Sequence, residues 1–225
     1  DARKLTHIAY LRRDPLAPPR WEGAPTNLPR HPLVLDDERI VPVGIAFDDE
    51  GTGPLAASAL LSFEDEVIPE DVRTALRHRV QIGTLRARIQ VPELLAVLEA
   101  LEARGIAATA HKGPALSALA YGRAGIRDSV DLDLLVREGD VTAAERALRE
   151  RGYRRNSPGD LRPRLEAGWR KAWNETEFES ADGWTFVDLH WRICPARFPF
   201  RVDTPRLWSR RHRVTLGGRE VPVFP

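Results

Sequence analysis

The chain has 225 residues, with 34 basic and 33 acidic side chains and a net charge of +1. This balance leaves nucleic-acid binding possible but does not indicate it. An apolar fraction of 42% predicts a folded core, and no run approaches the roughly 18 apolar residues of a membrane span. The single cysteine, Cys194, excludes an internal disulfide and a multi-thiolate zinc site, and is consistent with a cytoplasmic protein. Abundant Arg, Ala and Pro are typical of a bacterial genome rich in GC.

Residues 1–68 are predicted to form an N-terminal arm, partly irregular and partly helical, because its first part is rich in proline and charge. Short strands are expected at 31–35 and 39–47. Residues 69–225 are predicted to form one domain.

This domain is predicted to begin with two helices. Apolar residues recur at approximately helical spacing in the first of them, at Val72, Leu76, Val80, Leu85 and Ile89. Proline is favoured in the first turn of a helix and glycine just after its end. Pro92 is therefore expected to open the second helix and Gly105 to end it.

Strands and helices then alternate. Strands are predicted at 106–112 and 129–136, with a short helix beginning at Pro114 between them. A further helix is expected from the N-cap Asp140 to Gly152. Two hairpins follow, around 181–183 and around Gly217-Gly218. The pattern predicts an α+β or mixed α/β fold, with a small mixed sheet flanked by helices.

The strand at 129–136 contains two aspartates, Asp131 and Asp133. Residues i and i+2 of a strand point to one face, so these acids project together, while Val130, Leu132 and Leu134 face a core. Two neighbouring carboxylates repel each other, and a divalent cation such as Mg²⁺ would remove that repulsion. The structural alternative is an acidic face that reaches solvent or pairs with an arginine such as Arg127.

The segment HKGPALSALAYG predicts a strand end, a glycine turn and a helix start. Gly113 would let the backbone approach a phosphate, and the amides of Ala115 and Leu116 would donate to it. Lys112, just before the turn, could also reach a phosphate. An ordinary strand-to-helix turn is the structural alternative.

A third acid, Asp188, lies within the predicted strand FVDLHW and shares a face with His190. If that strand neighbours the D-x-D strand, three carboxylates could hold two metal ions for phosphoryl or nucleotidyl transfer. The alternatives are an arginine partner for Asp188 and a structural role for His190. Glu175, Glu177 and Glu179 are expected to form a solvated face, with one of them able to approach the metals.

The succession of KGPALSALAYG, RDSVDLDLLV and VDLHW resembles the uncharacterised nucleotidyltransferase family of the DNA polymerase beta-like nucleotidyltransferase superfamily. The resemblance covers about residues 85–195. It implies a small mixed sheet flanked by helices that binds Mg²⁺ or Mn²⁺ and an NTP. Asp131 and Asp133 match the paired metal ligands and Asp188 matches the third acid. In the same motifs, Gly113 matches the glycine of the phosphate turn, Lys112 its lysine, and Arg127 the arginine before the acids.

The expected mechanism uses two ions. One, held by all three acids, would present an acceptor hydroxyl to the α-phosphate, and the other, held by Asp131 and Asp133, would carry the triphosphate. Asp188 is then the expected activator of the nucleophile. This chain departs from the family at Gly113-Pro114, where the superfamily has Gly-Ser or Gly-Gly.

Three functions are consistent with these patterns. The first is a metal-dependent nucleotidyltransferase that moves NMP from an NTP to a hydroxyl of a small molecule, a protein or RNA. The second is a degenerate module that binds a nucleotide or a partner without activity. The third is a glycosyltransferase of the D-x-D type, which the Lys-Gly turn and the third acid disfavour.

Overall fold

The computed structural model describes residues 30–35, 39–44, 53–62, 68–127, 129–156, 168, 170–195, 197–199 and 202–224. Much of the predicted N-terminal arm, including 1–29 and 45–52, lies outside this set. The chain divides into two compact units, of which the first runs through Leu85 and includes residues 126–128, and the second holds the rest. The division falls after Leu85, inside a helix.

The first unit contains two strands and two helical segments. Strands β1 (Arg30–Leu35) and β2 (Arg39–Gly44) pair antiparallel, which confirms the two predicted strands. Helix α1 (Gly53–Leu60) follows, and then the first part of α2 (Glu70–Glu102). A small core joins the two helices and explains why this part of α2 groups with α1; it is formed by Ala57, Ile68, Val72 and Leu76.

The helix predicted from Val72 to Ile89 is present as part of α2. Its residues Leu85 and Ile89 are 56% and 55% exposed, because the step of five residues from Val80 turns the helix well past the face of Val72 and Leu76. The prediction of a new helix beginning at Pro92 was wrong, because the chain forms one helix through it. Proline removes one backbone hydrogen bond, but the helix continues because its next turns are anchored in the core by Leu94, Val97 and Leu101.

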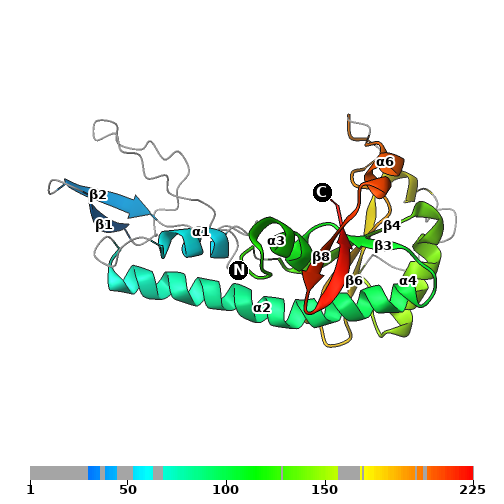
Figure 1. Cartoon of the computed structure of the whole chain (residues 1–225), viewed down its shortest axis with the longest axis horizontal. Helices are drawn as coiled ribbons and strands as arrows, with labels where there is room; N and C mark the ends of the chain where they lie inside the picture. Colours follow the sequence, from blue (N-terminus) through cyan, green and yellow to red (C-terminus); the bar gives the residue numbers. More distant parts are fainter. Residues whose placement is uncertain are drawn as a thin grey trace. The chain divides into compact units, whose positions relative to one another are not determined.

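The second unit is built on a seven-stranded mixed sheet, drawn with its helices in Figure 1. The strand order is β5-β6-β7-β4-β3-β9-β8. The pairs β4·β7 and β3·β9 are parallel and the other pairs are antiparallel. The strands are β3 (Ala108–Ala110), β4 (Asp131–Val136), β5 (Arg154–Arg155), β6 (Glu175–Glu179), β7 (Phe186–His190), β8 (His212–Leu216) and β9 (Arg219–Val223). The predicted mixed sheet flanked by helices is confirmed.

Both predicted hairpins are present. Strands β6 and β7 join through Gly183, at φ 74°, and β8 and β9 join through Gly217 and Gly218, at φ 57° and 80°. Two consecutive left-handed residues form the two-residue turn whose twist matches that of the flanking strands. Glycine adopts this conformation without a Cβ penalty, so the sequence was sufficient to predict these turns.

Besides the part of α2 from Arg86 on, the helices described for this unit include α3 (Gly113–Tyr121), the 3₁₀ turn η1 (Glu138–Asp140), α4 (Val141–Glu150) and α6 (Thr204–Ser209). Asp140 occupies the N-cap position of α4, as predicted, but its side chain makes no capping hydrogen bond. The preceding turn η1 gives Asp140 a helical backbone conformation (φ −94°, ψ −7°), whereas a capping residue needs an extended one.

The two faces of β4 differ as the alternation predicts. Leu132, Leu134 and Val136 are buried in the main core with residues of α2, α3 and α4. Val130 was expected on this face but is 61% exposed, because β4 begins only at Asp131. On the opposite face, Leu135 packs in a smaller cluster with Trp208 of α6 and Phe224. Among the helices that the structure describes, none is long and apolar enough to cross a membrane.

Candidate active site

The three predicted acids come together on the β4 and β7 strands. These strands are parallel neighbours, and their register places Asp133 directly opposite Asp188. Asp131 precedes Asp133 by two residues and therefore shares its face. One oxygen from each of the three carboxylates lies within 4.8 Å of the others. The structure thus forms the three-carboxylate cluster expected from the sequence, here called the acid triad (Asp131, Asp133 and Asp188).

Two members of the acid triad hold protons more tightly than ordinary aspartates. Burial raises the pKa of Asp188 to about 7, and the negative charges of Asp131 and Asp133 contribute to the rise. Burial also raises the pKa of Asp131, with further repulsion from Asp133. Hard oxygen donors that repel one another fit a divalent cation such as Mg²⁺, which would relieve the repulsion.

Asp133 is in a different electrostatic environment. It is 2% exposed, and its Oδ1 accepts hydrogen bonds from Lys112 Nζ at 2.8 Å and from His190 Nε2 at 3.0 Å. Burial by itself would raise the pKa of Asp133, but the bonds from His190 and Lys112 outweigh it and lower the pKa to about 2. Asp133 is therefore ionised at neutral pH before any metal binds.

Lys112 and Gly113 form the turn between β3 and α3, beside the start of β4. Gly113 has a φ of +59°, and a Cβ on it would lie 3.2 Å from the backbone oxygen of Asp131. The Nζ of Lys112 is at Asp133 rather than free in solvent, although its side chain is 49% exposed. The glycine thus permits the close approach of the turn to β4 that brings Lys112 to the acids.

The predicted backbone donors of this turn are mostly occupied or enclosed. The Leu116 N–H donates to the carbonyl of Lys112 at 3.3 Å, so it already has a partner. Ala115 is 0% exposed and packs in the main core. A phosphate contact of Ala115 or Leu116 remains a prediction.

The segment before β4 is fixed by a side chain of α2. Gln90 Nε2 donates to the backbone oxygen of Ser129 at 2.9 Å, and Ser129 Oγ donates to Gln90 Oε1 at 3.2 Å. Ser129 Oγ is also 3.4 Å from the Cβ position of Gly113. Arg127, predicted to contact phosphate, is grouped with the first unit, and its role remains a prediction.

Replacing Gly113 by alanine is expected to cost about 1–2 kcal/mol of stability, because alanine is disfavoured at positive φ. The added Cβ would also push on the backbone at Asp131 and disturb the acid triad. Gly122→Ala is the matched control, since Gly122 has a φ of +77° and nothing within 4 Å of its Cβ position. Urea denaturation of both variants checks this, and a larger loss of stability in Gly122→Ala than in Gly113→Ala would contradict it.

The imidazole of His190 links the acid triad to the next strand. It is 1% exposed, and its Nδ1 lies 2.9 Å from Glu175 Oε2 on β6. Asn174 Nδ2 donates to Glu175 Oε2 at 2.9 Å and is 3.5 Å from His190 Nδ1. Burial lowers the pKa of His190, but the bonds to Asp133 and Glu175 outweigh it and raise the pKa overall. Glu175 is the glutamate that approaches the site.

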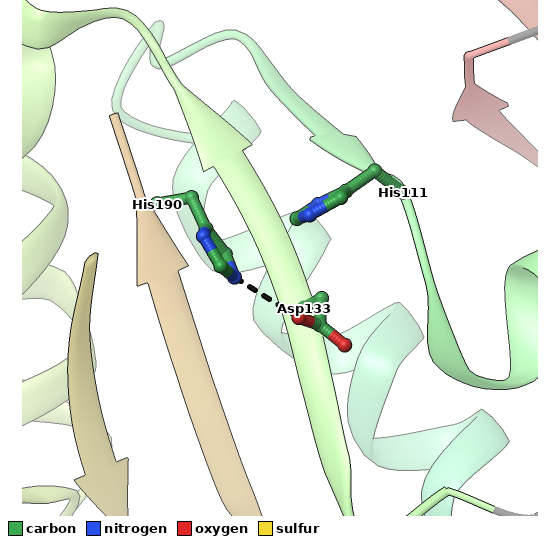
Figure 2. Close-up of side chains that lie close together, drawn as sticks. All are labelled: His111, Asp133 and His190. Atoms are coloured by element: carbon green, nitrogen blue, oxygen red, sulfur yellow. Dashed lines mark hydrogen bonds and ion pairs between the residues drawn. The ribbon is translucent and has the colours of Figure 1, made fainter. Parts of the chain in front are cut away.

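His111 is a site neighbour that the sequence analysis did not identify. Its backbone N–H donates to the carbonyl of Asp133 at 3.3 Å, so the β3–β4 pairing continues past the end of β3. Its ring packs edge to face on His190, with centroids 4.5 Å apart. Figure 2 shows His111, Asp133 and His190 together. Strand alternation from Ala110 places His111 on the acid face, but only the β3–β4 register puts it opposite Asp133.

The chain is similar to known nucleotidyltransferases. The family described as "Uncharacterised nucleotidyltransferase" matches residues 46–225. No curated protein matches the chain. A solved structure of the lincosamide antibiotic adenylyltransferase LnuA, bound to lincomycin, is 13% identical with a TM-score of 0.42, over 60% of this chain and 79% of that one.

The antibiotic-resistance factor ANT(2'')-Ia matches through two structures. Its solution structure is 18% identical with a TM-score of 0.40, over 61% of this chain and 65% of that one. Its complex with adenylyl-2''-tobramycin is 18% identical with a TM-score of 0.41, over 61% of this chain and 70% of that one. Since the family match extends over most of the sequence and includes all three acids, the chain belongs to the uncharacterised nucleotidyltransferase family.

Proposed function

We propose that this protein is a metal-dependent nucleotidyltransferase that transfers NMP from an NTP to a hydroxyl group of an acceptor. The observation that carries the proposal is the acid triad, whose three carboxylate oxygens lie within 4.8 Å of one another. Paired carboxylates plus a third acid on a neighbouring strand are suited to hold divalent ions against a triphosphate.

The protonation of the acid triad supports a cation site. Burial and mutual repulsion raise the pKa of both Asp131 and Asp188, so three negative charges do not coexist easily without a counter-ion. Asp131, Asp133 and Asp188 would hold Mg²⁺. When bound, the ion would neutralise charge on the triphosphate and make the acceptor hydroxyl more acidic.

The nucleotide would be held by the turn beside the triad. Lys112 is 49% exposed and bonds to Asp133, so it could exchange this carboxylate for a phosphate oxygen when a cation takes its place. Gly113, beside the start of β4, would let the phosphates approach the backbone. His190 and Glu175 would keep the Asp133 carboxylate in position during this exchange.

The reaction forms a bond between the acceptor oxygen and the α-phosphorus and breaks the bond from that phosphorus to the bridging oxygen. Pyrophosphate leaves with the electron pair of the broken bond. The pKa of Asp188 is raised to about 7 in the metal-free protein. A bound Mg²⁺ would lower this pKa, and the ionised Asp188 carboxylate would accept the proton of the acceptor hydroxyl.

Calorimetric titration of ATP, CTP, GTP and UTP, each with and without Mg²⁺, tests the proposal. We expect Mg²⁺-dependent binding of at least one NTP to the wild type and none to an Asp131→Asn/Asp133→Asn double variant. Asp140→Asn is the matched control, because Asp140 lies in the same unit and makes no capping bond. A folded wild-type protein that binds none of the four would overturn the proposal.

A nucleotide-binding module without turnover is the second candidate. It is favoured by the Lys112–Asp133 ion pair at 2.8 Å, which already neutralises one acid, and by the complete burial of Ala115. Such a module would bind an NTP equally well in EDTA and in Mg²⁺, and the double variant would retain the affinity. Strict Mg²⁺ dependence would exclude it.

A further inference from the structure

A second group of metal-ligating side chains adjoins the acid triad. His111, Asp133 and His190 each offer one ligand atom, and these atoms lie within 4.8 Å of one another. The three residues come from adjacent strands of the sheet, just after β3, in β4 and at the end of β7. Figure 2 shows the two imidazole rings on either side of the Asp133 strand.

One ring nitrogen of His111 is unpaired within the described part of the chain. Its Nδ1 is buried and has no hydrogen-bond partner among the described residues. The ring is fixed by its edge-to-face contact with His190, at an interplanar angle of 86°. Buried polar atoms in folded proteins are nearly always paired, and an unpaired one indicates strain, catalysis or an ion.

His190 has the hydrogen bonding typical of a metal-ligating histidine. Its Nδ1 is 2.9 Å from Glu175 Oε2 while its Nε2 points to Asp133 Oδ1 at 3.0 Å. Histidines that bind metals usually donate their other ring N–H to a carboxylate, which fixes the tautomer and the ring orientation. Glu175 is in place to do this, and an ion would replace the proton that Nε2 donates to Asp133 Oδ1.

We propose that His111, Asp133 and His190 form a site for Zn²⁺, different in ligand chemistry from the acid triad and sharing Asp133 with it. Two imidazoles and one carboxylate suit zinc-like ions, whereas Mg²⁺ prefers oxygen ligands only. Three protein ligands would leave one position of a tetrahedral ion for water or another molecule. When the ion binds Asp133, the half-exposed Lys112 side chain would give up its bond to that carboxylate and turn to solvent.

The shared carboxylate makes the two sites interdependent. The part of the inference that concerns inhibition rests on the proposed function: zinc held through Asp133 would remove a ligand from the Mg²⁺ of the acid triad and lower Mg²⁺-dependent NTP affinity. The zinc site itself does not depend on that function.

Titration with Co²⁺, followed by its visible absorption, tests the site, because nitrogen ligands and low coordination intensify the bands. We expect one Co²⁺ per chain, displaced by Zn²⁺. His111→Ala should weaken the binding by more than about 10-fold, the smallest loss typical of removing a hydrogen-bond partner of a ligand, because it removes a ligand itself. His212→Ala, which removes an exposed histidine of β8 in the same unit, should leave it unchanged.

Asp188→Asn separates the two metal sites. It should leave Co²⁺ binding intact, because Asp188 is not among the three ligands. Wild-type affinity in His111→Ala, or loss of Co²⁺ binding in Asp188→Asn, would overturn the inference. If melting shows that His111→Ala does not fold, His111→Gln takes its place with the same expectation.

The outcomes also separate this inference from the proposed function. Co²⁺ binding through His111 without any Mg²⁺-dependent NTP binding would retain the zinc site and reject the transferase. If NTP binding depends on Mg²⁺ but Co²⁺ binding does not depend on His111, the transferase is retained and the zinc site is rejected.

Discussion

Replacement of Asp133 by asparagine is expected to lower the free energy of unfolding by about 3 kcal/mol, the lower end for breaking a buried ion pair. It should also weaken Mg²⁺-dependent NTP binding by more than about 100-fold, which exceeds the loss seen when a hydrogen-bond partner of a metal ligand is removed. Asp133 and His190 are each 2% exposed in their side chains and 3.0 Å apart. An amide keeps the volume of the carboxylate but leaves His190 and Lys112 without their negative partner.

Urea denaturation and nucleotide titration measure the two effects. Asp131→Asn is the matched control within the acid triad. The pKa of Asp131 is raised by burial and by repulsion from Asp133, so neutralising it should preserve or increase stability while still removing NTP binding. If both variants had the same stability, the bonds of Asp133 to Lys112 and His190 would not contribute to folding as argued.

Mg²⁺ affinity is expected to rise by up to about tenfold per pH unit between pH 5 and 7 and to level off above pH 7, as one released proton requires. The reason is Asp188, whose pKa is raised by burial and by its acidic neighbours to about 7 in the metal-free protein. Below that pH the carboxyl group is protonated, and Mg²⁺ must displace the proton. Calorimetry in buffers of different ionisation enthalpy counts the protons released.

The raised pKa of Asp188 also affects the stability of the metal-free protein. An unfolded aspartate has a pKa of about 3.9, so the raised folded-state pKa of Asp188 stabilises the protein fully below that value. This contribution is lost as the pH rises through about 7. Asp188→Asn should remove the contribution of Asp188 to both pH dependences and leave that of Asp131, whose pKa is also raised by burial. Mg²⁺ affinity that stays flat from pH 5 to 8 in the wild type would show that Asp188 does not titrate in this range.

The helix predictions show where local patterns are insufficient. Proline lowers helix propensity but does not prevent a helix whose next turns are packed, and Leu94, Val97 and Leu101 bury the helix beyond Pro92. Packing of α2 against the sheet therefore decided whether the chain forms one helix or two. Asp140 was placed correctly in sequence, but η1 decided its backbone angles.

The sequence by itself determined which face of its strand each side chain takes and where the turns lie. Alternation in β4 put Asp131 and Asp133 on one face and Leu132 and Leu134 in the core, and the glycines of the hairpins specified their turns. These features are local, because side-chain direction in a strand and positive φ at a glycine need no distant partner.

Only the tertiary structure decided which of these side chains meet. The parallel register of β4 and β7 aligns Asp133 with Asp188, and Asp133 and His190 bond although they are 57 positions apart in the chain. His111 and Glu175 reach the site through the pairing of β3 with β4 and of β6 with β7. A sequence pattern fixes which face a residue takes, whereas register between distant strands is set by the packing of the whole sheet and its helices.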